Sequence, residues 1–185
     1  MMIRKTFYAL AFGLLALSAC QDDEPSVEAV LRYDGENATG PFLEQGEHEL
    51  AIHFPASTMA DYTGRELTEV SFFVGDALPA QCQVRVYRGG TVSPGGLEYS
   101  FDVTDGLQTL RWNRHILSSP LALEGDDLWI SVFVTHAVGQ QSIGCDAGPR
   151  KDGGDWLYQE ADGSWQTYQQ RTTESVNWNI RGTTR

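Results

Sequence analysis

Carboxylates crowd one Gly-rich part of this 185-residue chain, where together they could hold a cation. Asp146, Asp152 and Asp155 lie in this part, and Glu160 and Asp162 follow it closely. Ca²⁺ takes about six to eight oxygen ligands from carboxylates and loop carbonyls, so the first three acids predict a structural calcium site. The spacing does not match an EF-hand, and the alternative is a set of solvated turn residues. No other cofactor is expected.

Four aromatic residues flank the turn dipeptide Asp162-Gly163: they are Trp156, Tyr158, Trp165 and Tyr168. Aromatic rings combine a large apolar face with a polar edge, so this set could form a platform on which a sugar stacks. Large aromatic side chains also fill the interiors of β-sandwiches, which makes alternate members of the set candidates for the core. The sequence leaves both interpretations open.

Two cysteines, Cys82 and Cys145, lie in the body of the chain. In an exported protein such a pair predicts a disulfide, which would stabilise the fold by about 4 kcal/mol through restriction of the unfolded chain. The alternatives are two separate thiols, or a Cys145 nucleophile assisted by His136. No orienting Asn or Asp pattern accompanies that pair, and the four histidines lack metal-ligand spacing. We therefore expect no catalytic residues and no enzyme activity.

The first residues have the layout of a secretory signal, with Arg4 and Lys5 ahead of an apolar segment. The following Leu17-Ser18-Ala19-Cys20 resembles the lipobox of bacterial lipoproteins. The resemblance implies that residues 1–19 are cleaved and that Cys20 receives a lipid anchor, which attaches the protein to a membrane. The alternative is an ordinary signal peptide with an incidental cysteine.

The residues directly after Cys20 are Gln21, Asp22, Asp23 and Glu24. They resemble the acidic tag that directs Bacteroidetes-type lipoproteins to the outer face of the outer membrane, so we expect a lipid-anchored protein exposed at the cell surface. Residues 20–30 are expected to comprise the acylated Cys20 and an acidic linker. The alternative to the tag is that residues 21–26 are only a solvated acidic linker. The formal net charge of −12 repels phosphate backbones, and nucleic-acid binding is therefore not expected.

A strand at 127–137 is the element around which the rest of the chain is expected to pack. Its nearly unbroken apolar run from Leu128 to Val134 is typical of a strand buried on both faces. Alternating apolar residues predict further strands, including 27–33, 47–54 and a closing strand at 176–182, and segment 55–62 has room for one helical turn. The pattern predicts an all-β, antiparallel sandwich with at most one short helical turn in the mature chain.

Several motifs resemble the jelly-roll modules of secreted Bacteroidetes proteins, including the adhesin modules of gingipain-type proteases. They include Leu31-Arg-Tyr-Asp-Gly, Gly144-Cys-Asp-Ala-Gly-Pro and Asn177-Trp-Asn-Ile. The resemblance implies a jelly-roll β-sandwich over residues 31–185 that acts as a binding module. We expect a non-catalytic adhesion module for a glycan or a protein, of undetermined oligomeric state. The alternatives are a structural or assembly subunit of an outer-membrane complex and, less favoured, a carboxylate-dependent glycoside hydrolase.

Overall fold

The computed structural model describes residues 27–185. The predicted signal peptide, the lipidated Cys20 and the tag residues Gln21, Asp22, Asp23 and Glu24 lie outside the described residues. Among the described residues, no helix is long and apolar enough to cross a membrane.

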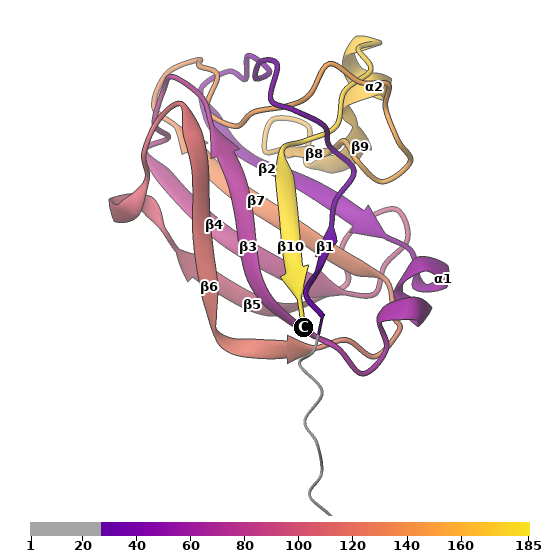
Figure 1. Cartoon of the computed structure of the whole chain (residues 1–185). Helices are drawn as coiled ribbons and strands as arrows, with labels where there is room; N and C mark the ends of the chain where they lie inside the picture. Colours follow the sequence, from indigo (N-terminus) through magenta and orange to yellow (C-terminus); the bar gives the residue numbers. More distant parts are fainter. Residues whose placement is uncertain (1–26) are drawn as a thin grey trace, which may run out of the picture.

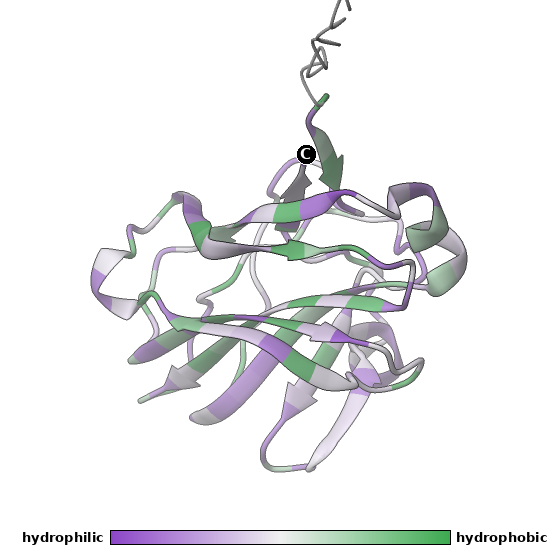
Figure 2. Ribbon diagram, turned by 90° about the horizontal axis from the view of Figure 1, so that it is seen from below, coloured by the Kyte–Doolittle hydropathy of each residue, from purple (hydrophilic) through white to green (hydrophobic). Residues whose placement is uncertain are grey.

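Two antiparallel sheets face each other and form a sandwich, as Figures 1 and 2 show from two directions. The four-stranded sheet has the order β1 (Ala29–Leu31), β10 (Ile180–Thr184), β3 (Glu66–Val74) and β6 (Arg111–Ala122). The six-stranded sheet has the order β5 (Gly96–Asp102), β4 (Gln81–Arg88), β7 (Leu128–His136), β2 (Gly46–Phe54), β8 (Trp156–Gln159) and β9 (Ser164–Thr167). The predicted all-β sandwich is confirmed.

The pairing of the strands is nested along the chain. The innermost pair is β4 with β5, followed outward by β3 with β6, β2 with β7 and β1 with β10. Successive pairs lie in alternate sheets: β4–β5 and β2–β7 belong to the six-stranded sheet, and β3–β6 and β1–β10 to the four-stranded sheet. A long hairpin folded over in this way is a jelly roll, and the β8–β9 hairpin extends its larger sheet. The predicted jelly roll is therefore confirmed as well.

The strand β7 lies inside the larger sheet and is covered on both faces, as predicted. Ile130, Val132 and Val134 point into the core between the sheets and are fully buried. Trp129 and Phe133 point to the opposite face, yet they are also buried there, at 0% and 7% exposure. A strand with two covered faces must be apolar throughout, which explains its unbroken run of apolar residues.

Short helices occupy the connections between strands. The predicted helical turn is present as α1 (Ala56–Met59) followed by the 3-10 turn η1 (Ala60–Tyr62), and a second 3-10 turn, η2 (Thr104–Gly106), joins β5 to β6. A further short helix, α2 (Tyr168–Thr172), was not expected from the sequence. Its N-terminus carries a capping box in which the side chains of Thr167 and Gln170 bond reciprocally to backbone N–H groups.

Replacing Ile130 by alanine is expected to lower the free energy of unfolding by about 2–5 kcal/mol, because the substitution leaves a cavity in the packed core. Ile116 is a matched control: it also lies in a strand but is 72% exposed, so Ile116→Ala should change stability by no more than about 0.5 kcal/mol. Urea denaturation of both variants measures the difference. Equal losses would contradict the assigned core.

Candidate functional site

The outer face of the six-stranded sheet carries the candidate site. Leu50, Ile52 and Phe54 of β2 belong to the core, so the alternation of a strand places Glu49 and His53 on the opposite face. The same alternation applies to the neighbouring strands. It turns Arg85 and Tyr87 of β4, Ser131 and Phe133 of β7, and Tyr158 of β8 outward.

The strand register lines these outward residues up in rows across the sheet. One row contains the directly paired residues Gln83, Phe133, Glu49, Tyr158 and Trp165, which come from β4, β7, β2, β8 and β9. Polar and aromatic side chains therefore mix within a single row. Neighbouring rows add Arg85 and Ser131 on one side and Gln81 and Glu47 on the other.

A buried carboxylate, Glu49, is the centre of a hydrogen-bond network on this face. Its exposure is only 4%, so its charge must be compensated by nearby groups. Tyr87 Oη and Ser131 Oγ donate to Oε1 over 2.7 and 2.5 Å, and Arg85 Nη1 donates to Oε2 over 2.9 Å. Burial, reinforced by the Glu49 charge, raises the pKa of Tyr87, so its hydroxyl keeps the proton that it donates. The network holds three side chains in fixed positions.

Each of the three nitrogen atoms of the Arg85 guanidinium donates a hydrogen bond within the fold. Besides its bond to Glu49, Nε and Nη2 donate to Oε1 of Gln83 over 3.1 and 2.8 Å. Its central carbon lies 4.0 Å above the ring of Phe133, a cation–π contact. Arg85 therefore acts as a structural part of this surface.

The predicted aromatic platform is formed in part. Trp156 and Trp165 contact Trp129, with ring centroids 5.1 and 5.7 Å away, and Tyr158 contacts Trp165 at 5.8 Å. The rings of Trp156, Tyr158 and Trp165 are half-buried on the outer face. Trp129 lies fully buried beneath them, where His53 stacks on it at 4.3 Å.

The fourth predicted member, Tyr168, does not belong to the platform. It is 7% exposed and packs in the core against Trp178, with ring centroids 5.2 Å apart. The reason is the helix α2, which begins at Tyr168 and ends the alternation of β9. Assigning Tyr168 to ligand binding was therefore wrong.

A cavity of about 520 Å³ opens on this face. A hollow of this size is typical of sites for small ligands, which combine aromatic walls with a few polar groups. Trp165, Tyr158 and Phe133 supply the aromatic part of its lining. Its other lining residues are Glu47, Glu49, Gln81, Gln83, Arg85, Tyr87 and Pro94.

The loop between β4 and β5 forms one border of the cavity through Pro94. Trp129 Nε1 donates to the carbonyl of Gly90 over 2.7 Å and ties the loop to the sheet. Gly90 has a φ of +86°, and a Cβ at this position would lie 2.0 Å from the carbonyl oxygen of Ser93. Only glycine fits there, so the Gly89-Gly90 pair sets the path of this border.

A second cavity, of about 670 Å³, lies between the edge strands β5 and β6. Phe72, Phe101 and Leu107 contribute apolar surface, and Phe101 stacks on His115 at 4.6 Å. Tyr99 Oη lies 2.7 Å from Nε2 of His115, and this contact ties β5 to β6. The two acids among its described lining residues, Asp102 and Asp105, are exposed, so this cavity has no buried carboxylate that fixes polar side chains as Glu49 does on the sheet face.

The predicted disulfide is not formed: Cys82 and Cys145 are both buried free thiols. Cys82 is held in β4 opposite Val134, whereas Cys145 is held in a loop region by bridges to Thr39 and Trp178. Different backbone pairings fix the two residues, and no bond joins their sulfur atoms.

The alternative role of Cys145 as a nucleophile has no support in this geometry. Burial raises the pKa of its thiol to about 12, so the reactive thiolate is absent at neutral pH. His136 is 1% exposed and its Nε2 lies 2.7 Å from Oγ of Ser142. The histidine is thus engaged by a hydroxyl group within the fold.

The predicted calcium site is not formed by Asp146, Asp152 and Asp155. Among residues 27–185, no three His, Cys, Asp or Glu side chains gather in a way that could hold a metal ion. Asp146 instead accepts hydrogen bonds from the backbone N–H groups of Gly35, Gly148 and Asn177, and from the Asn177 side chain. Desolvation opposes ionisation of Asp146, but these donors outweigh it and lower its pKa.

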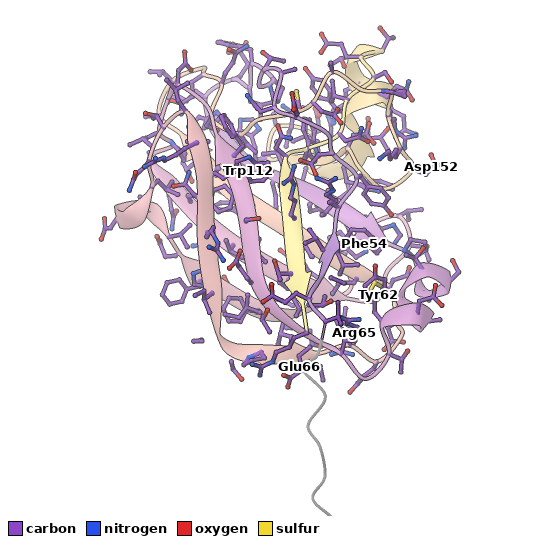
Figure 3. The ribbon with its side chains drawn as sticks, in the orientation of Figure 1. Phe54, Tyr62, Arg65, Glu66, Trp112 and Asp152 are labelled. Carbon is purple, nitrogen blue, oxygen red and sulfur yellow. The ribbon has the colours of Figure 1, made fainter. Side chains whose placement is uncertain are left out.

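The other two acids pair with Arg150. Asp155 is fully buried, accepts from Arg150 Nε over 2.7 Å, and also accepts from the backbone N–H of Gln169 over 3.0 Å. Burial raises the pKa of Asp155 in spite of these donors. The side chain of Asp152 is fully exposed and lies at the periphery in Figure 3, where it contacts Arg150 Nη1 at 2.7 Å. The three carboxylates that were expected to bind an ion are thus paired with donors of the protein itself.

The central residues of the site were missed from the sequence. Glu49, Arg85 and Tyr87 come from strands that are distant in the chain, and their pairing requires the register of β2, β7 and β4. A usable signal was present in β2, where Glu49 alternates with the apolar residues Leu50, Ile52 and Phe54 and therefore lies on the face opposite the core.

Thiol titration tests the correction of the disulfide. In a Cys20→Ser variant of the chain, we expect no reactive thiol under native conditions, because both remaining cysteines are buried, and two thiols per chain in denaturant without reductant. Ellman's reagent measures both values. If no thiol were detected in denaturant, the disulfide would be present and the correction would be wrong.

The fold is similar to solved structures of a clostridial surface protein. One is the clostridial cysteine protease Cwp84 after propeptide cleavage, with a TM-score of 0.58, 13% sequence identity, and coverage of 85% of this chain and 40% of that one. Another contains the cysteine protease and lectin-like domains of Cwp84, a surface layer associated protein of Clostridium difficile, with a TM-score of 0.54, 12% identity and coverage of 77% and 33%.

The chain spans less than half the length of these two structures, and the low identity limits the similarity to the fold. No protein-family model matches the chain. No curated protein is significantly similar to it. The sandwich described above is therefore a fold that also occurs in a surface-layer associated protein.

Proposed function

We propose that this protein is a lipid-anchored, non-catalytic binding module that holds a glycan on the outer face of its six-stranded sheet at the cell surface. The observation that carries the proposal is the cavity of about 520 Å³, in which half-buried aromatic rings stand beside anchored polar groups. Sugars present both an apolar ring face and hydroxyl groups. A site that offers stacking surfaces and hydrogen-bonding groups together matches both features.

The aromatic and polar groups lie within reach of one ligand. Tyr158 and Trp165 are directly paired across β8 and β9, and Tyr158 is paired with Glu49 of β2 in the same row. The network around Glu49 fixes Arg85 and Tyr87 before any ligand arrives. Such preorganisation reduces the entropy lost on binding.

The bonding of Glu49 supports a role in binding over a role in hydrolysis. A glycoside hydrolase of the usual kind uses two carboxyl groups, one as an acid and the other as a base or nucleophile. Glu49 already accepts bonds from Tyr87, Ser131 and Arg85, so its oxygens are occupied by donors within the fold. The carboxylate-dependent hydrolase is accordingly the weaker alternative.

The proposed location is supported by the sequence of the leader. Leu17-Ser18-Ala19-Cys20 resembles a lipobox, and the acidic residues that follow it resemble a surface-export tag. The strand β1 begins at Ala29, so a short acidic segment would connect the anchor to the sandwich. The surface-layer association of the structurally similar Cwp84 is consistent with this location.

A second candidate function is that of an assembly subunit, favoured by the margin of the sandwich at β5 and β6. Both are edge strands, and exposed edges invite pairing with another chain. Leu97, Phe101 and Ile116 on these strands are 55%, 48% and 72% exposed. A partner strand that covered this margin would bury them.

Glycan-array binding of the purified full-length protein, followed by titration with the best ligand, tests the main proposal. We expect Trp165→Ala to weaken binding about tenfold or more, because it removes a stacking surface from the cavity. Trp112→Ala is the matched control, since Trp112 lies on the smaller sheet (Figure 3). The guanidinium of Arg181 stacks on its ring there.

Equal losses from both tryptophan variants would place the ligand elsewhere. Absence of any glycan binding, together with a stable protein partner in crosslinking, would favour the assembly subunit.

Metabolic labelling with palmitate tests the anchor. We expect the wild-type protein to incorporate label and to partition into detergent, and the Cys20→Ser variant to do neither, because acyl chains are the proposed means of attachment. Surface exposure is checked by adding protease to intact cells. An unlabelled wild-type protein would refute the anchor while leaving the glycan site untouched.

A further inference from the structure

We infer that the site on the six-stranded sheet selects uncharged glycans and disfavours acidic ones, such as uronate-containing or sulfated chains. This inference rests on the proposed function, since it assigns the class of glycan to the same site. It follows from the charged groups in the cavity and from the partners that each of them already has.

Acidic groups outnumber basic ones in the cavity lining. Glu47 and Glu49 both lie on β2, two residues apart and on the same outward face. Arg85 is the one cation among the described residues that line the cavity. The lining therefore carries a net negative charge before a ligand binds.

Arg85 is already paired within the fold before a ligand binds. Its guanidinium donates to Glu49 over 2.9 Å and to Gln83 over 2.8 and 3.1 Å, and it lies 4.0 Å from the ring of Phe133. Diverting it to a ligand carboxylate would leave Glu49, at 4% exposure, as a buried charge with a missing partner. Such a loss is costly, so the existing pair is expected to persist.

The basic residues that come next along β4 and after β9 are engaged as well, and neither lines the cavity. Arg88, the next basic residue along β4, contacts Glu124 at 2.9 Å and Glu98 at 3.6 Å. Arg171, which follows β9, contacts Asp162 and donates to the carbonyl of Ser164 over 2.9 Å. Neither supplies a spare positive charge.

Glu47 is the group that distinguishes acidic from neutral glycans. Its side chain is exposed at the cavity, and no hydrogen bond or ion pair to it occurs among residues 27–185. A carboxylate or sulfate on a ligand would meet this uncompensated charge, and like charges held close together oppose binding. A neutral sugar hydroxyl can instead donate a hydrogen bond to it.

The remaining polar groups of the cavity are uncharged and suit hydroxyl groups. The Gln83 amide accepts from Arg85 through its oxygen, which leaves its NH₂ group as a donor. Gln81 uses its NH₂ group to contact Asp102 at 3.3 Å, which leaves its oxygen as an acceptor. The hydroxyl of Tyr158 serves as either. Donors and acceptors are thus supplied without a cation.

The test compares neutral and acidic oligosaccharides of equal length on the full-length protein. The probes are hexasaccharides of glucose, xylose, mannose and galactose, set against hexagalacturonate and a sulfated hexasaccharide, with affinities measured by calorimetry. We expect the best neutral probe to bind at least about tenfold more tightly than either acidic probe. Glu47→Gln should raise the affinity for the acidic probes about threefold or more and change the affinity for the neutral probe less than about twofold.

Glu36→Gln is the control for net charge, because Glu36 is exposed and lies outside the cavity lining while the substitution removes the same charge. Glu36→Gln should change neither the affinity for the neutral probes nor the affinity for the acidic probes. Acidic probes that bind as tightly as neutral ones, or a Glu36→Gln effect equal to that of Glu47→Gln, would overturn the inference and leave the glycan site standing. If no probe of either class binds, the proposed function itself fails.

Discussion

The constraint on which the structure depends is that β7 is covered on both faces. Its inward residues build the core between the sheets, and its outward residues Trp129, Ser131 and Phe133 lie beneath the candidate site. Because β4 and β2 flank it, each outward side chain of β7 is bracketed by one residue from either neighbour. The rigid floor of the cavity is thus the back of the same strand that stabilises the fold, so core packing and site geometry are coupled.

The burial of Glu49 determines which polar groups of the cavity remain free to bind a ligand. A carboxylate placed on a packed sheet must find donors, and it finds them on β4 and β7, at Arg85, Tyr87 and Ser131. The pairing of Arg85 with Glu49 uses the one cation among the described residues of the cavity lining. The groups that remain for a ligand are the amides of Gln81 and Gln83, the hydroxyl of Tyr158 and the carboxylate of Glu47. The selectivity that we propose is therefore a consequence of stabilising one buried charge.

Much of the fold could be predicted from the sequence, because apolar alternation and the run at Leu128 to Val134 report directly on burial. The site was predicted less well. Trp156, Tyr158 and Trp165 were identified because a turn brings them together locally, whereas the Glu49 network depends on a register that no short segment encodes. The predicted disulfide and calcium site were wrong for a related reason: composition showed which residues were present, but not that Arg150 and backbone amides already satisfied the acids.

The nested pairing of the strands also determines at which point of synthesis the fold can be completed. Ala29 of β1 pairs with Thr184 of β10. The first strand of the sandwich can therefore pair only after nearly the last residues of the chain are present. Contacts between such distant segments make folding slow, and the smaller sheet cannot close before the end of the chain has been synthesised. An early stop that removed β10 would leave β1 unpaired and would uncover one side of β3. Such a truncated chain would present an open sheet edge that can pair with other chains.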